Sequence, residues 1–597
     1  MRIPRRCGLL SFILLPLLGF FVAPPASAKI DYRISLADRA NHRFAVTMDI
    51  HNPVTNTQIA IPAWNALYQI RDFSVRVRDV HLDPTYPIRK VDKQTWSIGD
   101  PMNPLAGNVP DDFVVHYTVE WNDPGPFDSQ LDARHAFLNL AEVLMYVPNR
   151  RPEAVEVAFD DVPAGWKVAA ELPAGSEPNS FSAPSYDVLV DAPVEAGTFR
   201  ESSFDVDSVH YRVILDSTVS GSGALDANLR KIVSYESTLM QGTPFREYTF
   251  FFHIGAYPDV GGGGMEHSNC TAIAAPTVDS ATATAAHEFF HAWNVKRVRP
   301  KSLEYIDFSR EQYTRSLWFA EGVTSAYAAF TLERTGLWSK DLFLMDLGEQ
   351  ISDLQSRSAR SWQSVEESSL DAWLEKYDSY RAPDRSISYY NKGQILGDLL
   401  DLSIRQATKN HKSLDDVLRL LNDEYAQKGK FYDESAGILS AVNDVAGMSF
   451  ADFFHRYVSG TDEIPYAQFL SYAGLDLKEE SQVTSDLGFW PGQARGAKIP
   501  TVATIEAGSP AEAADLRVGD DIIRLNNEPF PHQFRNWLRN QPPNATVTLR
   551  VRRDGKELDI SYRMASVETD HFSVSEDPHP TDLQRRIRDG FFRGTTD

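Results

Sequence analysis

The segment from Thr284 to Trp293 constrains this chain more than any other, because it places two histidines four residues apart and a glutamate directly after the first. In a helix, residues four apart lie on one face, so His287 and His291 can reach the same metal ion while Glu288 lies beside them. The alternative is a pair of half-buried histidines on an amphipathic helix. The pattern by itself therefore indicates a zinc peptidase site. The rest of the sequence must decide between this interpretation and the pair of half-buried histidines.

A third ligand is needed, because catalytic zinc takes three protein ligands and leaves one position open. No third histidine follows at short spacing. Only Glu321 lies in an apolar segment of helical character, residues 316–327, where an unpaired carboxylate would be costly and a dication would satisfy it. Glu311 has the surroundings of a solvated surface residue. We therefore favour Glu321 over Glu311 as the third ligand.

Three segments together resemble the glycyl aminopeptidase family of gluzincin metallopeptidases: His287–Pro300, Leu317–Gly322 and Tyr389–Gly393. Related larger aminopeptidases also carry a Trp-x-x-Glu-Gly segment and a catalytic tyrosine before a Lys-Gly pair, although their glutamate lies nearer the second histidine. The resemblance covers essentially the whole mature chain. It implies a multidomain α+β protein with a β-rich N-terminal domain, a thermolysin-like α+β zinc domain with a helical subdomain, and a PDZ domain.

The resemblance also implies roles for individual residues. One Zn²⁺ per chain would be held by His287, His291 and Glu321 and would lower the pKa of a water molecule towards about 7. Glu288 would act as general base and pass the proton to the leaving amine. Tyr390 would donate a hydrogen bond to the developing oxyanion, with the adjacent Tyr389 as the alternative.

Upstream, an apolar strand pattern at Tyr248–Ile254 leads into a glycine-rich run that ends in Gly264, Met265 and Glu266. In the related aminopeptidases a Gly-x-Met-Glu-Asn segment binds the substrate, and its glutamate holds the free α-amino group. Glu266 would then fix the amine by a charge-assisted hydrogen bond. His267 replaces the asparagine of that pattern. The alternative is a flexible hairpin tip with an exposed glutamate.

The first 28 residues predict a secretory signal peptide: basic residues, a short apolar stretch broken by Pro16, and an Ala-Ser-Ala end. We therefore expect a periplasmic or secreted protein without stable membrane insertion. After cleavage Cys270 is the only cysteine, so no intramolecular disulfide is possible. The formal charge of −23 argues against nucleic acid as a partner.

The order of patterns along the chain predicts a domain division. Residues 1–28 form the signal, 29–222 a β-rich domain, 223–475 the zinc metallopeptidase domain (helical from about 315), 476–566 a PDZ domain and 567–597 a flexible polar tail, apart from a short helix expected at residues 582–592. The PDZ resemblance implies that a groove accepts a C-terminal peptide, whose carboxylate is held by the loop Leu487, Gly488 and Phe489.

The function expected from these features is zinc-dependent hydrolysis of the N-terminal residue from peptides with a free N-terminus, and the preference for Gly or Ala comes only from the resemblance. Two alternatives stay open. In one, Glu266 contacts backbone and the protein is an endopeptidase. In the other, the protein is a PDZ-bearing peptide-binding protein with a vestigial peptidase site.

Overall fold

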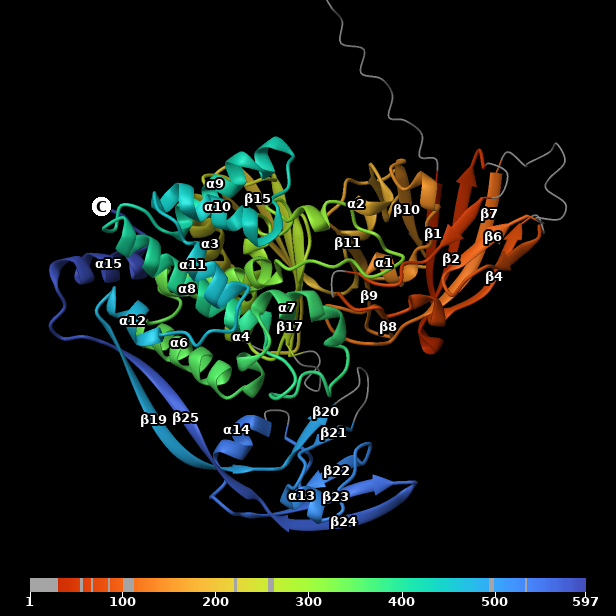
Figure 1. Cartoon of the computed structure of the whole chain (residues 1–597). Helices are drawn as coiled ribbons and strands as arrows, with labels where there is room; N and C mark the ends of the chain where they lie inside the picture. Colours follow the sequence, from red (N-terminus) through yellow and green to blue (C-terminus); the bar gives the residue numbers. More distant parts are fainter. Residues whose placement is uncertain are drawn as a thin grey trace, which may run out of the picture.

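The computed structural model describes residues 30–53, 57–65, 68–83, 86–99, 112–219, 223–255, 262–492, 499–531 and 534–597. The predicted signal segment lies outside these ranges, as does Gly261 of the glycine-rich run. Figure 1 shows the β-rich N-terminal part at one end, most of the helices at the other, the mixed sheet between them and the small β domain below. Among the described residues, no helix has the length and apolar character needed to cross a membrane.

The N-terminal part is built from three sheets, and the long strands of the largest alternate buried and less buried side chains, as expected for a sheet with one face on a core. The largest has the order β12-β10-β1-β2-β7-β4, the second β11-β13-β9-β8 and the third β3-β6-β5. The strands of the first are β1 (Ile30–Asp38), β2 (Arg43–His51), β4 (Val77–Asp83), β7 (Asp112–Glu120), β10 (Val155–Asp160) and β12 (Ser180–Ala183). Those of the others are β3 (Gln58–Ala60), β5 (Ile88–Lys90), β6 (Thr95–Ile98), β8 (Gln130–Leu131), β9 (His135–Leu138), β11 (Lys167–Ala170) and β13 (Val194–Gly197), with short helices α1 (Leu140–Val143) and α2 (Tyr186–Val190) between them.

The central sheet has the order β14-β15-β16-β18-β17, and its bounds correct the predicted domain boundary at residue 222. Its strands are β14 (Arg200–Val206), β15 (Val209–Ser217), β16 (Glu247–Ile254), β17 (Gly263–Glu266) and β18 (Cys270–Ala275). Because β15 pairs with β16 over eight residues, β14 and β15 belong to this sheet and not to the N-terminal domain. Helices α3 (Gly223–Leu239) and α4 (Val278–Phe290) pack against each other beside it.

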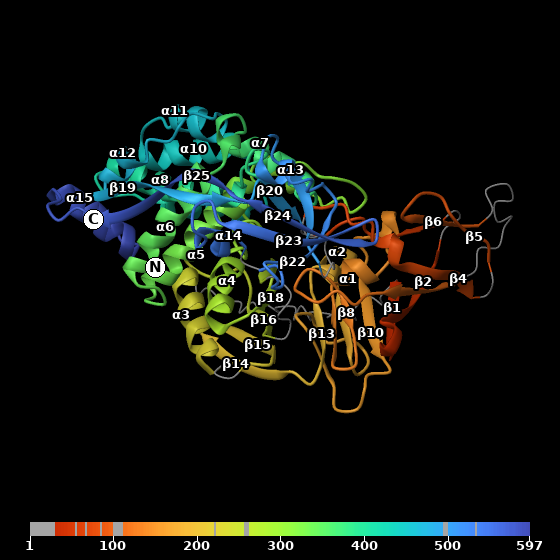
Figure 2. The ribbon, with the colours of Figure 1, turned by 90° about the horizontal axis from the view of Figure 1, so that it is seen from below.

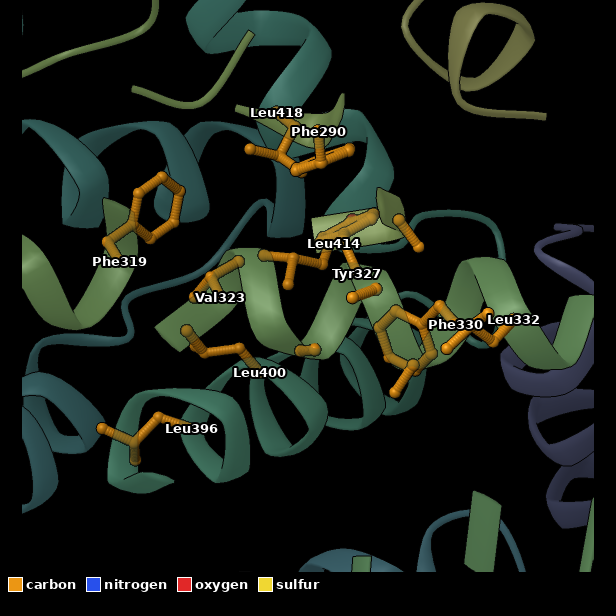
Figure 3. Packing of buried hydrophobic residues seen from close by; sticks show 14 of the residues in the cluster. Phe290, Phe319, Val323, Tyr327, Phe330, Leu332, Leu396, Leu400, Leu414 and Leu418 are labelled. Atoms are coloured by element: carbon orange, nitrogen blue, oxygen red, sulfur yellow. The ribbon is translucent and has the colours of Figure 1, made fainter. Parts of the chain in front are cut away.

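A helical layer covers the central sheet and supplies most of the largest hydrophobic core. Figure 3 shows how Phe290 of α4, Tyr327 of α5 and Leu400 of α8 contribute to one cluster of apolar side chains. The helices are α5 (Thr324–Arg334), α6 (Lys340–Gln355), α7 (Val365–Leu370), α8 (Tyr389–Ala407), α9 (Leu414–Glu424), α10 (Glu434–Ala446), α11 (Ala451–Phe453) and α12 (Tyr466–Ser471). Helix α8 is buried along almost its whole length and therefore forms the axis of this layer.

A long two-stranded ribbon, β19 (Leu475–Asp486) paired with β25 (Ala565–Glu576), connects the helical layer to the small β domain. That domain contains the sheet β20-β21-β22-β23-β24 and its own core. Figures 1 and 2 show the ribbon running out to the domain and back. Its elements are β20 (Phe489–Gly492), β21 (Thr501–Ile505), α13 (Pro510–Ala513), β22 (Asp521–Leu525), α14 (Phe534–Arg539), β23 (Thr546–Arg553) and β24 (Lys556–Arg563).

The expectation of a flexible tail from residue 567 is wrong, but the short helix expected at residues 582–592 is present. Strand β25 continues to Glu576, and helix α15 (Asp582–Arg593) then packs on the helical layer with Phe591 fully buried against Phe330 and Phe343. Beyond the helix, the carbonyl of Thr595 accepts a hydrogen bond from Arg405 of α8. Polar composition suggested a loose end, but one apolar face of α15 is enough to anchor it.

A buried Glu195 joins the N-terminal part to the central sheet. One carboxylate oxygen lies 2.9 Å from Nδ1 of His135 on β9, and the other lies 3.0 Å from Nε2 of His253 on β16. The side chain of Gln130 donates to Asp132, so its oxygen faces Nε2 of His135 at 3.2 Å and accepts from it. His135 therefore donates from both ring nitrogens and carries a positive charge opposite Glu195.

Candidate active site

Helix α4 delivers the three residues of the HExxH pattern to one point. It begins with a capping box at Thr277 and ends at Phe290, and His291 follows as the C-cap in right-handed helical geometry, so it stays on the face of His287. The Nε2 atoms of the two histidines lie 3.0 Å apart. Glu288 is 5% exposed, and its Oε2 has no hydrogen-bond partner.

Glu321 reaches the two histidines from a separate element. It lies in a π-helical turn, Trp318–Val323, that runs into α5, a kind of distortion that is frequent at functional sites. Its Oε2 is 3.2 Å from Nε2 of His291 and 3.5 Å from Nε2 of His287. No residue near Glu311 takes part in this cluster.

The donor set fits a zinc-like cation. Nδ1 of His291 donates to the carbonyl of Asn294 at 2.7 Å, which leaves the lone pair of Nε2 pointing at the cluster. Two imidazole nitrogens and a carboxylate oxygen that converge in this way repel one another unless a positive charge lies between them. Burial lowers the pKa of His291, but the charge of the Glu321 carboxylate outweighs it and raises that pKa to about 10.

Residues around the cluster hold its members in orientation. The side chain of Asn294 donates to the carbonyl of Phe319 at 2.9 Å and to Thr324 at 3.1 Å, and so ties the end of α4 to the π-helical turn. Ser325 lies 3.3 Å from Nδ1 of His287 and donates its own proton to the carbonyl of Glu321. Such contacts fix the tautomer and angle of metal-ligating histidines.

Two glycines bring Tyr390 to this cluster. A Cβ on Gly322 would lie 2.4 Å from the Cα of Gly393, and one on Gly393 would lie 2.3 Å from a backbone oxygen of the π-helical turn. The start of α8 can therefore approach Glu321 only because both positions are glycine. The ring centroid of Tyr390 lies 6.2 Å from that of His287. Tyr390 is 39% exposed whereas Tyr389 is 4% exposed, so only Tyr390 is open to a substrate.

Strand β17 brings Glu266 close to the same cluster. Carboxylate and ring atoms of Glu266, Glu288 and His291 lie within 4.8 Å of one another. A Cβ at Gly264 would lie 2.3 Å from Glu288, so a side chain there would displace the glutamate. Met265 is buried, and its sulfur accepts from Asn139 of the N-terminal domain. Burial raises the pKa of Glu266, and it raises that of Glu288 well above the ordinary value.

Two residues of the N-terminal domain, Asp191 and Tyr68, lie beside the site without any motif in the sequence to indicate them. Asp191 accepts from Lys296 at 2.8 Å and from the backbone of Ser268, and lies 3.4 Å from Nδ1 of His267. Tyr68 packs against Ala320, the residue before Glu321, and has a positive φ of 48°. Bulky residues rarely adopt that conformation, and such strain concentrates at functional sites.

The predicted carboxylate loop lies between β19 and β20. Leu487 and Phe489 are buried in the core of the small β domain, and Gly488 has a φ of 69°. The N–H of Gly488 donates to a side-chain oxygen of Asp486 at 2.9 Å. An amide that would face a terminal carboxylate thus already has an acidic partner, and Pro491 in β20 has no N–H to offer a bound strand.

Comparison with known proteins agrees with this arrangement. Residues 31–198 match the family model of the peptidase M61 N-terminal domain, residues 280–396 that of M61 glycyl aminopeptidase, and residues 474–563 that of a PDZ domain. A search of curated proteins found no match.

One solved structure resembles nearly the whole chain in fold, and others match more remotely. The crystal structure of an aminopeptidase N family protein from Idiomarina loihiensis is 23% identical with a TM-score of 0.79, and the match covers 94% of this chain and 100% of that one. An M1 zinc metallopeptidase from Deinococcus radiodurans is 16% identical with a TM-score of 0.45, over 73% of this chain and 94% of that one.

The domains and the matched segments define a peptidase of the metallo-aminopeptidase class. The chain carries an M61 N-terminal domain, an M61 glycyl aminopeptidase domain and, in addition, a PDZ domain.

Proposed function

We propose that the chain is an exported zinc aminopeptidase that removes the N-terminal residue, Gly or Ala by family resemblance, from peptides with a free amino terminus. His287, His291 and Glu321 would hold one zinc ion. When bound, the ion supplies Lewis acidity towards the scissile carbonyl and makes a water molecule more acidic. This assignment draws on the donor geometry described above and on the family.

The side chains supply the remaining steps. Glu288 accepts the proton of the attacking water and delivers it to the amine that leaves. Tyr390 donates a hydrogen bond to the carbonyl oxygen as negative charge develops there. The C–N bond breaks, and the two products are the free N-terminal amino acid and the shortened peptide.

One observation carries the choice of aminopeptidase: a second carboxylate, Glu266, lies within 4.8 Å of Glu288 and His291. A buried carboxylate at this distance from the reacting groups is suited to bind an ammonium group by a charge-assisted hydrogen bond. The substrate of an endopeptidase offers no ammonium group that could neutralise this carboxylate, because internal peptide bonds are uncharged.

The test uses purified mature protein with Gly- and Ala-anilides and their N-acetylated forms, with and without a chelator and added zinc. We expect chelator-sensitive cleavage of the free substrates only, and its loss in Glu288→Gln with zinc still bound. Cleavage of both forms would indicate an endopeptidase. A protein that never binds zinc would favour the peptide-binding alternative.

Export and the PDZ ligand belong to the same proposal. Residues 1–28 have the pattern of a secretory signal, so we propose a periplasmic or secreted enzyme. N-terminal sequencing of the protein from cell fractions would test this. The PDZ domain would bind a peptide segment as an added strand.

A further inference from the structure

A cavity of about 500 Å³, within the size range of ligand pockets, lies between the N-terminal domain and the central sheet. Its wall includes Glu266 of β17, the proposed amine anchor, and Tyr68 of the N-terminal domain. The three proposed metal ligands and Tyr390 are not among the described residues that line it. The cavity and the metal cluster are therefore neighbouring spaces, and Glu266 borders both of them.

Tyr68 lies between these two spaces. It packs against Ala320, the residue before the third proposed ligand, and against Val295 and Leu303, which belong to the cavity wall. Trp64, another residue of that wall, also contacts Tyr68, with the ring centroids 5.9 Å apart. The Tyr68 side chain thus separates the metal cluster from the cavity.

Tyr68 also lies beside the place that the first residue of a substrate must occupy. A substrate whose amine rests on Glu266 and whose carbonyl faces the metal ligands has its first α-carbon between Glu266 and Glu321. Burial raises the pKa of Tyr68 well above its ordinary value, and the nearby charges of Glu266 and Glu321 raise it further. The first side chain of the substrate therefore meets Tyr68 before it can reach the cavity.

The Tyr68 ring is held in place by its surroundings. The ring of Trp373 lies edge-on to it, with the centroids 6.1 Å apart, and Trp64 packs beside both rings. Trp64 is itself fixed, because its Nε1 donates a hydrogen bond to the carbonyl of Asp307 at 2.7 Å. The positive φ of Tyr68 is a conformation that persists only where the surrounding structure enforces it. Turning the ring aside would break these contacts.

We propose that Tyr68 sets the size of the N-terminal residue that the enzyme accepts: its ring leaves room for Gly or Ala and blocks larger side chains from the cavity behind it. The inference rests on the proposed aminopeptidase function. It supplies a physical cause for the preference that family resemblance suggests, because a larger side chain would have to displace a close-packed ring.

The test compares kcat/KM for Ala-anilide and Leu-anilide in the wild type, in Tyr68→Ala and in Tyr68→Phe. We expect the wild type to favour Ala by about ten-fold or more, the size of effect that a small pocket provides. In Tyr68→Ala the ratio of Leu to Ala should rise by about ten-fold or more, because the side chain can enter the cavity. Tyr68→Phe keeps the ring and should keep the wild-type ratio.

Tyr377→Ala is the matched control, since that tyrosine is 53% exposed, and it should also keep the wild-type ratio. If Tyr68→Ala does not fold, Tyr68→Leu gives the same comparison, because it keeps an apolar contact and removes the ring. Equal rates on both substrates in the wild type, or an unchanged ratio in the variant without the ring, would overturn the proposal. A Tyr68→Phe ratio that matched Tyr68→Ala would also overturn it, because the hydroxyl and not the ring would then decide.

A binding measurement separates this proposal from the catalytic one. Calorimetry with zinc-loaded Glu288→Gln and the amides of alanine and leucine reports the size of the pocket without turnover. Tighter binding of leucine amide when Tyr68→Ala is added to this variant supports the role of the ring even if no anilide is cleaved. Unchanged binding of leucine amide overturns it even if the aminopeptidase activity is present.

Discussion

The Glu288 side chain lies directly over the α-carbon of Gly264, and this contact leads to a first prediction. A Cβ at position 264 would come within 2.3 to 2.4 Å of three Glu288 atoms, so Gly264→Ala must push the carboxylate aside. We expect kcat/KM to fall about 100-fold, because displacement of a catalytic group by about 1 Å has effects of this size. Zinc content should stay at the wild-type value.

Gly223→Ala is the matched control, since nothing lies within 4 Å of the added atom. If both variants kept wild-type activity, the position of Glu288 would not depend on Gly264.

Ser325 supports a second prediction at the same scale. It contacts Nδ1 of His287 at 3.3 Å and does not reach the centre of the cluster itself. Removing such an outer contact lowers metal affinity by roughly 10- to 100-fold. We expect Ser325→Ala to bind zinc at the low end of that range, as measured by competition with a chelator, while Ser356→Ala, at an exposed site, binds it normally.

The residues of the site differ in how far sequence could predict them. Helical periodicity placed His287 and His291 together, and the cost of a buried carboxylate pointed to Glu321. Asp191 and Tyr68 could not be found in this way, because their contacts form between segments about 75 or more positions apart. Only the three-dimensional packing reveals such neighbours.

At the scale of elements, Glu195 between β9, β13 and β16 leads to a third prediction. Burial lowers the pKa of His135, but the charge of Glu195 outweighs it and raises that pKa, whereas the pKa of Glu195 is lowered to about 2. The ion pair therefore stabilises the fold fully between the ordinary carboxyl pKa of about 4.3 and the ordinary histidine pKa of about 6.5. Its contribution fades as the pH rises through the raised pKa of His135 or falls towards 2.

Glu195→Gln should lower the free energy of unfolding by about 3 kcal/mol near pH 6, because it leaves a buried cation without its partner. The loss should shrink in alkaline solution, where His135 is neutral. Urea denaturation across the pH range measures this, with the exposed Glu247→Gln on β16 as control. A loss independent of pH would contradict the charged state assigned to His135.

The loop before β20 gives a fourth prediction. Asp486 accepts a hydrogen bond from the N–H of Gly488 and places negative charge where a peptide carboxylate would bind. We expect Asp486→Ala to bind C-terminal peptides at least about five-fold more tightly, because the substitution removes a carboxylate that repels the carboxylate of the peptide. Fluorescence anisotropy with a free and an amidated peptide measures it. Asp559→Ala, on the exposed face of β24, should leave affinity unchanged.

For the whole molecule, α15 is expected to be part of the stable catalytic body. Phe591 is fully buried between Phe330 and Phe343, so Phe591→Ala should lower the free energy of unfolding by about 3–5 kcal/mol. The exposed Arg585→Ala on the same helix should have little effect. Thermal and urea unfolding of the catalytic body would report both. Equal stability of the two variants would mean that α15 detaches without cost.

The order of the domains along the chain could be predicted from the sequence, but the boundaries between them could not. The alternating pattern of β14 and β15 is the same whether they join the N-terminal sheets or the central sheet, since both bury one face. Half of the residues of strand β25 are exposed, and its buried residues Phe572 and Val574 lie only near its C-terminal end, so its composition resembles that of a loose end.

The paired strands β19 and β25 make the PDZ domain a detour in a chain that returns to its starting body. Shortening the protein from its C-terminus would remove α15 before it removed the domain, so such truncations report on the catalytic body. Asp486 and Ala565 are paired across the ribbon, and a two-residue turn could join them. The PDZ domain can then be deleted, or replaced by another domain, without removing the segments of the peptidase that precede and follow it.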